Sequence, residues 1–381
     1  MIYEYLISFI LSFIVAFFAT PIAKKVAFKI GAVDVPRDNR RMHKKPIARL
    51  GGLAIISGFL VSVLFYVLDS FYDVNSPLNV NRQFFGFLAG MLIIVCIGII
   101  DDIKTLSARF KLVFQIISAL AVVLSGTRIE YVTNPFSETG ISRLNPILSY
   151  AITLIWIIGI TNAINLIDGL DGLAAGVSSI ASLSLFIVSI IFERWDVAIL
   201  TAALAGSTLG FLPYNFNPAK IFMGDTGATF LGFTLGVVSI QGTLKSYAAI
   251  AIAIPILVLG LPLFDTVFAI IRRFFNGKPI MEADRGHLHH RLIDMGLSQK
   301  QSVLIMYILS AALGLCAIVL ADKGALSAII LIISISVFII GGIRFMSEIN
   351  IEKNITSNEE SQTEQIDSKQ TAKQTLEGEA K

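Results

Sequence analysis

The sequence predicts an all-α polytopic membrane protein, because its composition and its charge pattern both differ from those of a soluble domain. Hydrophobic residues make up 55% of the 381 residues and charged residues only 15%. Soluble domains average about 45–50% and about 25%, respectively. The apolar residues are gathered into runs that approach the ~20 residues needed to cross a bilayer. Lys and Arg residues are gathered into alternate loops between those runs.

About eleven apolar runs are candidate transmembrane helices. They are residues 2–22, 50–68, 83–100, 111–125, 145–161, 173–192, 197–212, 226–240, 248–271, 301–320 and 326–346. The first run precedes Lys24 and Lys25, the reverse of the charge order in a signal peptide, so we expect a retained helix. Residues 347–381 lack aromatic side chains and are rich in Glu, Gln, Ser, Thr and Lys. We therefore expect a membrane domain over residues 1–346 and a disordered tail over 347–381.

The distribution of positive charge predicts the orientation of these helices. Nineteen Lys and Arg residues lie in the loops 23–49, 101–111, 213–225 and 272–300, whereas six lie in the opposite set of loops. Because positive residues accumulate on the cytoplasmic side, we expect the N-terminus outside and the C-terminus in the cytoplasm. Cys96 and Cys316 lie in separate apolar runs, and we interpret them as small hydrophobic residues rather than a disulfide.

A polar cluster separates the fifth and sixth apolar runs. Two Asn and two Asp residues recur there at a spacing of three, at Asn162, Asn165, Asp168 and Asp171. Neighbours at this spacing lie close on a helix, but all four cannot share one face. Glycines follow both Asp residues, which indicates that the helix opens here and lets the backbone approach a ligand. A polar helix end with turn glycines is the alternative interpretation.

A basic loop follows the first apolar run. Its candidate residues are Arg37, Arg41, His43 and Arg49. Arg makes forked contacts with phosphate groups, so the loop predicts anion recognition. Anchoring to anionic lipid headgroups is the alternative function for the same charges.

Carboxylates flank two of the runs at their predicted cytoplasmic ends. Asp101 and Asp102 are adjacent and would repel each other unless a cation shares them. Lys111 opens the next run and could hold an anion at headgroup depth, whereas a solvated loop is the alternative for this segment. Asp225 follows Gly224 at the start of an apolar run, which fits a helix N-cap. It also fits a Mg²⁺ ligand, because Mg²⁺ takes one or two protein ligands besides phosphates and water.

A histidine segment completes the set. Three of the four histidines are His287, His289 and His290, and Arg291 follows them. The crowded spacing without cysteine is not typical of a zinc site, so we interpret the segment as phosphate-binding, with a solvated basic loop as the alternative. Carboxylates for a divalent cation and basic groups for phosphates indicate phosphoryl transfer, which depends on positioning and charge neutralisation. A site at a bilayer mouth indicates one lipid substrate and one soluble substrate.

As a set, these clusters resemble the polyprenyl-phosphate N-acetylhexosamine-1-phosphate transferase superfamily, glycosyltransferase family 4, over residues 1–346. The resemblance implies transfer of a sugar-1-phosphate from a UDP-sugar to undecaprenyl phosphate, with release of UMP. It implies Mg²⁺, with Mn²⁺ as an alternative ion, bound by Asn165 and Asp225. The implied catalytic residues are Asp101, Asp102, Lys111, His287, His289 and His290. The implied substrate-binding residues are Asp168, Asp171, Arg291, Arg37, Arg41, His43 and Arg49.

The histidine segment also predicts the branch of the superfamily. Leu288 interrupts the three consecutive histidines of the phospho-MurNAc-pentapeptide branch. The segment resembles instead the GlcNAc-1-phosphate branch that begins teichoic acid, O-antigen or similar polymers. We therefore expect UDP-GlcNAc as donor and a bacterial plasma membrane location, with the site facing the cytoplasm. The resemblance is compatible with a homodimer, and we expect no nucleic-acid partner.

Three alternatives remain open from the residues alone. The first is the phospho-MurNAc-pentapeptide transferase of peptidoglycan synthesis. The second is a secondary transporter, whose sites would lie near the midplane, often with repeat symmetry. A membrane scaffold is the third, although it does not need five acidic or histidine clusters on one side. Within the transferase hypothesis, direct attack by the lipid phosphate and a covalent aspartyl-phosphate route both remain open.

Overall fold

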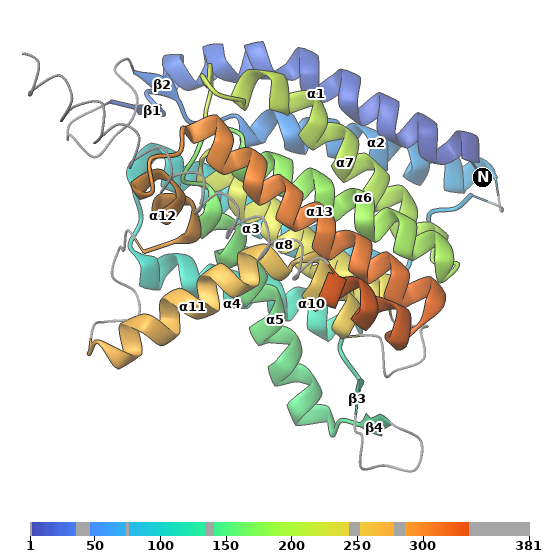
Figure 1. Ribbon diagram of the computed structural model, residues 1–381. Helices are drawn as coiled ribbons and strands as arrows, with labels where there is room; N and C mark the ends of the chain where they lie inside the picture. The colour runs from blue at the N-terminus through green and yellow to red at the C-terminus, as the bar shows by residue number, and fades with distance from the viewer. Residues whose placement is uncertain are drawn as a thin grey trace, which may run out of the picture. The chain divides into compact units, whose positions relative to one another are not determined.

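The computed structural model describes residues 2–35, 46–73, 76–133, 141–243, 252–277 and 286–334, and these are almost entirely helical (Figure 1). The helices are α1 (Ile2–Ile30), α2 (Gly52–Tyr72), α3 (Arg82–Lys104), α4 (Ala108–Leu124), α5 (Pro146–Ile167), α6 (Leu173–Ile191), α7 (Trp195–Asn215), α8 (Gly224–Thr243), α10 (Ala253–Val258), α11 (Gly260–Phe275), α12 (Leu288–Asp294) and α13 (Gln299–Lys323). The strands are β1 (Val33–Asp34), β2 (Ile47–Ala48), β3 (Tyr131–Thr133) and β4 (Ile141–Arg143).

Within the described ranges, seven helices are long and apolar enough to cross a membrane: α1, α2, α3, α5, α6, α7 and α13. The expected all-α, multi-pass membrane fold is therefore confirmed at this level. The expected runs 111–125 and 226–240 coincide with α4 and α8. These two helices are too short or too polar to count among the seven membrane-spanning candidates. The predicted tail, 347–381, and most of the last predicted run lie outside the described residues.

The predicted run 248–271 is not a single helix where the structure describes it. From residue 252 onward it forms two helices, α10 and α11, that meet at Leu259. Pro255 and Pro262 each lie in the first turn of one of the two helices. Proline is tolerated there but breaks a continuing helix, because it lacks an N–H and its ring clashes with the preceding turn. The two prolines therefore account for the break.

Helix α8 is the centre of the bundle. It packs against α2, α3, α5, α6 and α7, and every one of its residues except Asp225 is buried. A helix buried on all sides must offer small or apolar surface in every direction. Glycines allow the close approach: a Cβ on Gly52 of α2 would lie 2.2 Å from the Gly227 nitrogen, and one on Gly98 of α3 would lie 2.6 Å from the Thr226 Cα. This packing fixes where Asp225 emerges.

A short ladder of backbone hydrogen bonds fixes the approach to α8. Strand β1 pairs with β2 in antiparallel fashion, and the chain after β2 pairs with the residues just before α8. The Phe222 N–H donates to the Ala48 carbonyl at 2.8 Å, and the Gly52 N–H donates to the Met223 carbonyl at 2.8 Å. Arg49 lies inside this ladder and is thereby held beside the start of α8. These strands were not predicted from the sequence.

Candidate active site

The acidic pair Asp101 and Asp102 lies in the last turn of α3, which continues to Lys104. Each residue is only 6% exposed, so the solvated-loop interpretation of this segment is wrong. Although the two residues are adjacent in sequence, their carboxylates have different partners. Each partner set supplies the positive charge or the N–H donors that a buried carboxylate requires.

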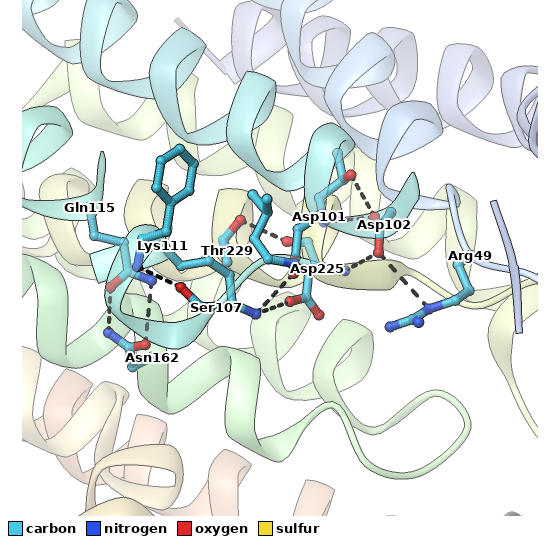
Figure 2. A network of polar contacts seen from close by, with 12 residues as sticks. Arg49, Asp101, Asp102, Ser107, Lys111, Gln115, Asn162, Asp225 and Thr229 are labelled. Carbon is cyan, nitrogen blue, oxygen red and sulfur yellow. Dashed lines mark hydrogen bonds and ion pairs between the residues drawn. The ribbon is translucent and has the colours of Figure 1, made fainter. Parts of the chain in front are cut away.

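The carboxylate of Asp101 shares a lysine with the carboxylate of Asp225. The Lys111 Nζ lies 2.9 Å from Asp101 Oδ2 and 2.7 Å from Asp225 Oδ2, as Figure 2 shows. Lys111 comes from the first turn of α4, so the ion pairs join α3, α4 and α8. The cation that the adjacent carboxylates were expected to need is therefore partly supplied by the protein itself.

The carboxylate of Asp102 caps the N-terminus of α8. Its Oδ1 accepts a hydrogen bond from the Asp225 N–H at 2.9 Å. Its Oδ2 accepts from the Thr226 N–H at 3.0 Å and from the Thr226 hydroxyl at 2.6 Å. These N–H groups have no partner within their own helix, and the helix dipole there favours negative charge. Asp225 was considered as an N-cap from sequence, but the capping carboxylate comes from α3.

Arg49 extends this network toward the basic loop. Its Nε lies 4.0 Å from Asp102 Oδ1. The glycine at position 224 has φ +72°, and a Cβ there would lie 2.5 Å from Asp102 Oδ2. Gly224 is therefore required both for its backbone conformation and for the approach of the capping carboxylate. Arg37, Arg41 and His43 lie outside the described residues.

The turn between α5 and α6 is where the predicted helix opening occurs. Helix α5 ends at Ile167, with Asp168 as its C-cap residue, and α6 begins at Leu173. Gly172 has φ +81°, a conformation that favours glycine. The Tyr307 hydroxyl of α13 donates to the Gly172 carbonyl at 2.6 Å. The opening predicted from the glycines is confirmed, and α13 helps to hold it.

The side chains of this opening have three different environments. Asn162 forms a reciprocal amide pair with Gln115 of α4, with a 2.7 Å bond from Asn162 Nδ2 to Gln115 Oε1. The Asp171 Oδ2 accepts from Asn217 Nδ2 at 2.9 Å and from the Ala219 N–H at 3.0 Å. Asn165, by contrast, is partly buried and its amide bonds to none of the described residues. Asp171 therefore holds the α7–α8 loop, while Asn165 keeps its donors and acceptor available.

Asp168 lies among several carboxylates. Burial, followed by the negative charges of Asp225 and Asp102, raises the pKa of Asp168 to about 7. The charge of Arg49 opposes this shift. Like charges that crowd a poorly solvated site hold one another protonated unless a cation is supplied. The pKa of Asp168 therefore indicates an incompletely neutralised acidic site.

A carboxylate that the sequence analysis missed, Asp265 of α11, organises the histidine segment. Its Oδ2 lies 2.8 Å from His287 Nδ1, and its Oδ1 accepts from the Leu288 N–H at 2.8 Å. His287 and His289 are buried, so the solvated-loop interpretation of this segment is wrong for these two side chains. The signal was a lone Asp inside an apolar run, which is costly without a partner.

The buried His289 touches the α5–α6 turn. A Cβ on Gly169 would lie 2.6 Å from His289 Nε2. The His289 Nδ1 has no hydrogen-bond partner among the described residues. Burial, followed by the charge of His290, lowers the pKa of His289 to about 4, so its imidazole is neutral at pH 7. The His290 ring lies beside it in a tilted orientation, with ring centroids 4.2 Å apart.

Residues from all five polar clusters are therefore brought together. Arg49 reaches Asp102, which caps α8; Asp225 of α8 shares Lys111 with Asp101. The negative charge of Asp225 raises the pKa of Asp168, and the adjacent Gly169 contacts His289. Among the described residues, no group of three or more His, Cys, Asp or Glu side chains is arranged as a metal site. The donor set is instead carboxylate, amide and lysine, which suits phosphate and a hard cation.

Comparison with known proteins identifies the family. The model of the family described as "Glycosyl transferase family 4" matches residues 84–243. A Bacillus subtilis protein named "Probable undecaprenyl-phosphate N-acetylglucosaminyl 1-phosphate transferase" is 40% identical over 83% of this chain and 84% of its own length. The chain belongs to glycosyl transferase family 4. The resemblance inferred from the motifs is thereby confirmed.

Two further relatives match over a similar share of the chain. The "Decaprenyl-phosphate N-acetylglucosaminephosphotransferase" of Mycolicibacterium smegmatis is 34% identical over 74% of this chain and 74% of its own length. The "Undecaprenyl-phosphate alpha-N-acetylglucosaminyl 1-phosphate transferase" of Salmonella typhi is 27% identical over 76% of this chain and 77% of its own length. The similarity to these relatives thus extends well beyond residues 84–243, the segment that the family model matches.

Proposed function

We propose that this protein transfers GlcNAc-1-phosphate from UDP-GlcNAc to undecaprenyl phosphate, giving undecaprenyl-pyrophosphoryl-GlcNAc and UMP. The Bacillus subtilis relative supports the acceptor and the transferred group by its name. The observation in the structure that carries the proposal is the shared lysine, whose Nζ bridges Asp101 and Asp225. Such a site can neutralise and orient two phosphate-bearing substrates, which is what phosphoryl transfer requires.

The residues at this site fit a magnesium ion, with Mn²⁺ as an alternative. Asp225 is the one residue of α8 that is not buried, and the Asn165 amide has no partner among the described residues. We propose these two side chains as the protein ligands. When bound, the ion would neutralise charge on the diphosphate and on the departing UMP. The raised pKa of Asp168 supports the need for a further cation at this place.

The acceptor needs little help from a protein base. A phosphomonoester has a second pKa of about 6, so undecaprenyl phosphate is largely dianionic at neutral pH. Both oxygens of Asp102 are occupied by the start of α8. We therefore assign Asp102 a positioning role, in which it fixes the orientation of Asp225. Lys111 offsets the repulsion between the acceptor phosphate and the carboxylates, and attack by a lipid phosphate oxygen on the β-phosphorus expels UMP directly.

The same proposal includes the orientation in the membrane. We infer that about eleven spans place the N-terminus outside and the site at the cytoplasmic face of the bacterial plasma membrane, where UDP-sugars are made. The excess of Lys and Arg in the loops that flank the site supports this orientation. The step would begin a cell-wall or surface polysaccharide.

The proposal is tested with the purified protein in lipid nanodiscs. With UDP-GlcNAc, Mg²⁺ and undecaprenyl phosphate, we expect stoichiometric release of UMP and formation of lipid-linked GlcNAc, and EDTA should stop both. UDP-MurNAc-pentapeptide in place of UDP-GlcNAc should release no UMP. Release of UMP only from UDP-MurNAc-pentapeptide, or from neither donor, would overturn the proposal.

A further inference from the structure

The carboxylate of Asp265 is buried, and the cost of its burial must be offset by specific hydrogen-bond partners. Its side chain is 4% exposed, and it lies on α11 between Phe264 and Thr266 in a largely apolar helix. Burying a carboxylate without partners costs several kcal/mol, so such residues are paired and hydrogen-bonded. Both partners of Asp265 given above, the His287 imidazole and the Leu288 N–H, belong to the histidine segment.

The first partner fixes the state of His287. An ionised carboxylate can only accept hydrogen bonds, so the Nδ1 at 2.8 Å must carry the hydrogen. In the neutral form of the imidazole, a hydrogen on Nδ1 leaves the lone pair on Nε2. This is the way in which a carboxylate orients a histidine and selects its tautomer in other histidine sites.

The second partner fixes the start of α12. His287 is the N-cap residue of this helix but makes no side-chain cap of its own. Asp265 supplies the cap from α11 by accepting from the Leu288 N–H. Helix α12 has seven residues, and helices this short are marginal without outside support. The cap therefore determines where His289 and His290 stand.

Two further residues on the same face of α11 hold the rest of the segment. Phe268 lies three residues after Asp265, and the Arg291 guanidinium lies over its ring, 4.9 Å from the centroid. Arg272 lies four residues further on, and its Nη1 donates to the Gly286 carbonyl at 2.6 Å. Positions spaced by three and four residues share one helix face. This face of α11 therefore contacts residues 286–291 at their beginning, middle and end.

We propose that Asp265 is a positioning residue for the transfer reaction, which acts through the tautomer of His287 and the start of α12 without touching a substrate. The inference rests on the proposed function. It predicts that Asp265→Asn lowers kcat by about 10–100-fold, as removal of a group that orients a functional ligand does. The amide can still accept from Leu288, but its NH₂ group faces His287 and forces the Nε2–H form.

Activity measurements separate this role from a general loss of packing. In Asp265→Asn, kcat should fall while KM for UDP-GlcNAc stays within about threefold. In a His287→Gln background, Asp265→Asn should reduce kcat by less than about threefold, because the residue through which it acts is already gone. The matched control is Thr266→Val, which removes a neighbouring hydroxyl that has no partner among the described residues, and it should leave kcat unchanged.

A spectroscopic measurement tests the inference whether or not the proposed reaction is correct. The chain has four histidines, so ¹⁵N-histidine labelling gives few signals, and His287→Gln assigns the relevant one. We expect the Nδ1–H form of His287 in the parent protein and the Nε2–H form in Asp265→Asn. An unchanged tautomer, an unchanged kcat, or equal losses in both backgrounds would overturn the inference. An inactive parent protein with a switched tautomer would instead count against the proposed function alone.

Discussion

Helices α8 and α12 are both capped at their N-termini by a carboxylate from another helix, but they depend on that cap to different degrees. In each case a carboxylate from another helix, Asp102 or Asp265, accepts backbone N–H bonds from the first turn. Helix α8 has 20 residues and is buried along its length, whereas α12 has seven. Packing alone locates α8, so its cap mainly supplies charge and orientation. The cap of α12 also decides where the helix lies.

The comparison extends to the charges at each place. At α8 the site is crowded with carboxylates and relies on Lys111. At α12 the buried His289 is neutral, because burial and His290 lower its pKa to about 4. The carboxylates and Lys111 at the start of α8 are therefore suited to cations and the acceptor phosphate. The neutral His289 of α12 is suited to hydrogen bonding. Substitutions on the α8 side should accordingly have the larger effects on the reaction.

The largest effect is expected for Lys111→Met. The change removes the ammonium between Asp101 and Asp225 and leaves their carboxylates to repel each other and the acceptor phosphate. We expect kcat/KM to fall by about 10³-fold, at the upper end for loss of a preorganised charge. Lys111→Arg is the matched control, because it keeps the positive charge and should therefore lose less of its kcat/KM. A loss below tenfold for the methionine variant, measured by UMP release, would show that the bridge is not needed.

The next effect is expected for Asp102→Asn. An amide can accept with one oxygen, but its NH₂ group then faces an N–H donor of α8, at a cost of about 1–3 kcal/mol in stability. We expect kcat to fall by about 10²-fold, with no recovery between pH 6 and pH 9.

The pH dependence discriminates between positioning and base catalysis. A variant that lacks only a base would regain activity as the lipid phosphate loses its proton above its pKa of about 6. Thr226→Val removes a single bond to Asp102 and should have a smaller effect. Recovery of Asp102→Asn at high pH would contradict the capping role and restore Asp102 as a base.

Gly169→Ala tests the joint between the two regions. The added methyl would lie 2.6 Å from His289 Nε2, so His289 must move away from the α5–α6 turn. We expect kcat to fall by about tenfold, because a displacement of about 1 Å costs up to 10²-fold in well-oriented sites. Gly159→Ala is the control, since a Cβ there meets nothing within 4 Å. Equal activity of both variants would show that the contact with His289 is dispensable.

The smallest effect concerns Asp168 and pH. Its folded-state pKa of about 7 lies above the unfolded value of about 3.9, so its contribution to stability is lost as pH rises from about 4 to about 7. A bound divalent cation would compete with this proton. We therefore expect Mg²⁺ to raise Tm by a few degrees more at pH 8 than at pH 6, and Asp168→Asn to abolish the difference. An equal shift at both pH values would contradict a cation beside Asp168.

Local patterns predicted the helices and the opening of the chain near Asp168, because apolar run length and glycine placement are properties of short segments. The capping of α8 could not be predicted in this way. Asp102 lies 123 residues from Asp225, and the contact is created by packing of α3 against α8. From sequence, Asp102 was grouped with Asp101 as one acidic pair, although Asp101 pairs with Lys111 and Asp102 bonds to the first turn of α8.

The histidine region was predicted only in part. The spacing of His287, His289 and His290 indicated a functional segment, but the preceding residues 248–271 were predicted to be a single transmembrane run. Pro255 and Pro262 carried the signal for the break between α10 and α11. The lone Asp265 carried the signal for a partner, but the identity of that partner depends on the fold.

The most direct test of a single shared site is an electron cryomicroscopy structure of the protein in nanodiscs with UDP-GlcNAc and Mg²⁺. The diphosphate should lie between Asp225 of α8 and residues 287–291, with Asp102 still bound to the first turn of α8 and Asp265 to His287. Donor density elsewhere, or Asp225 and His289 at opposite faces of the membrane, would contradict the account.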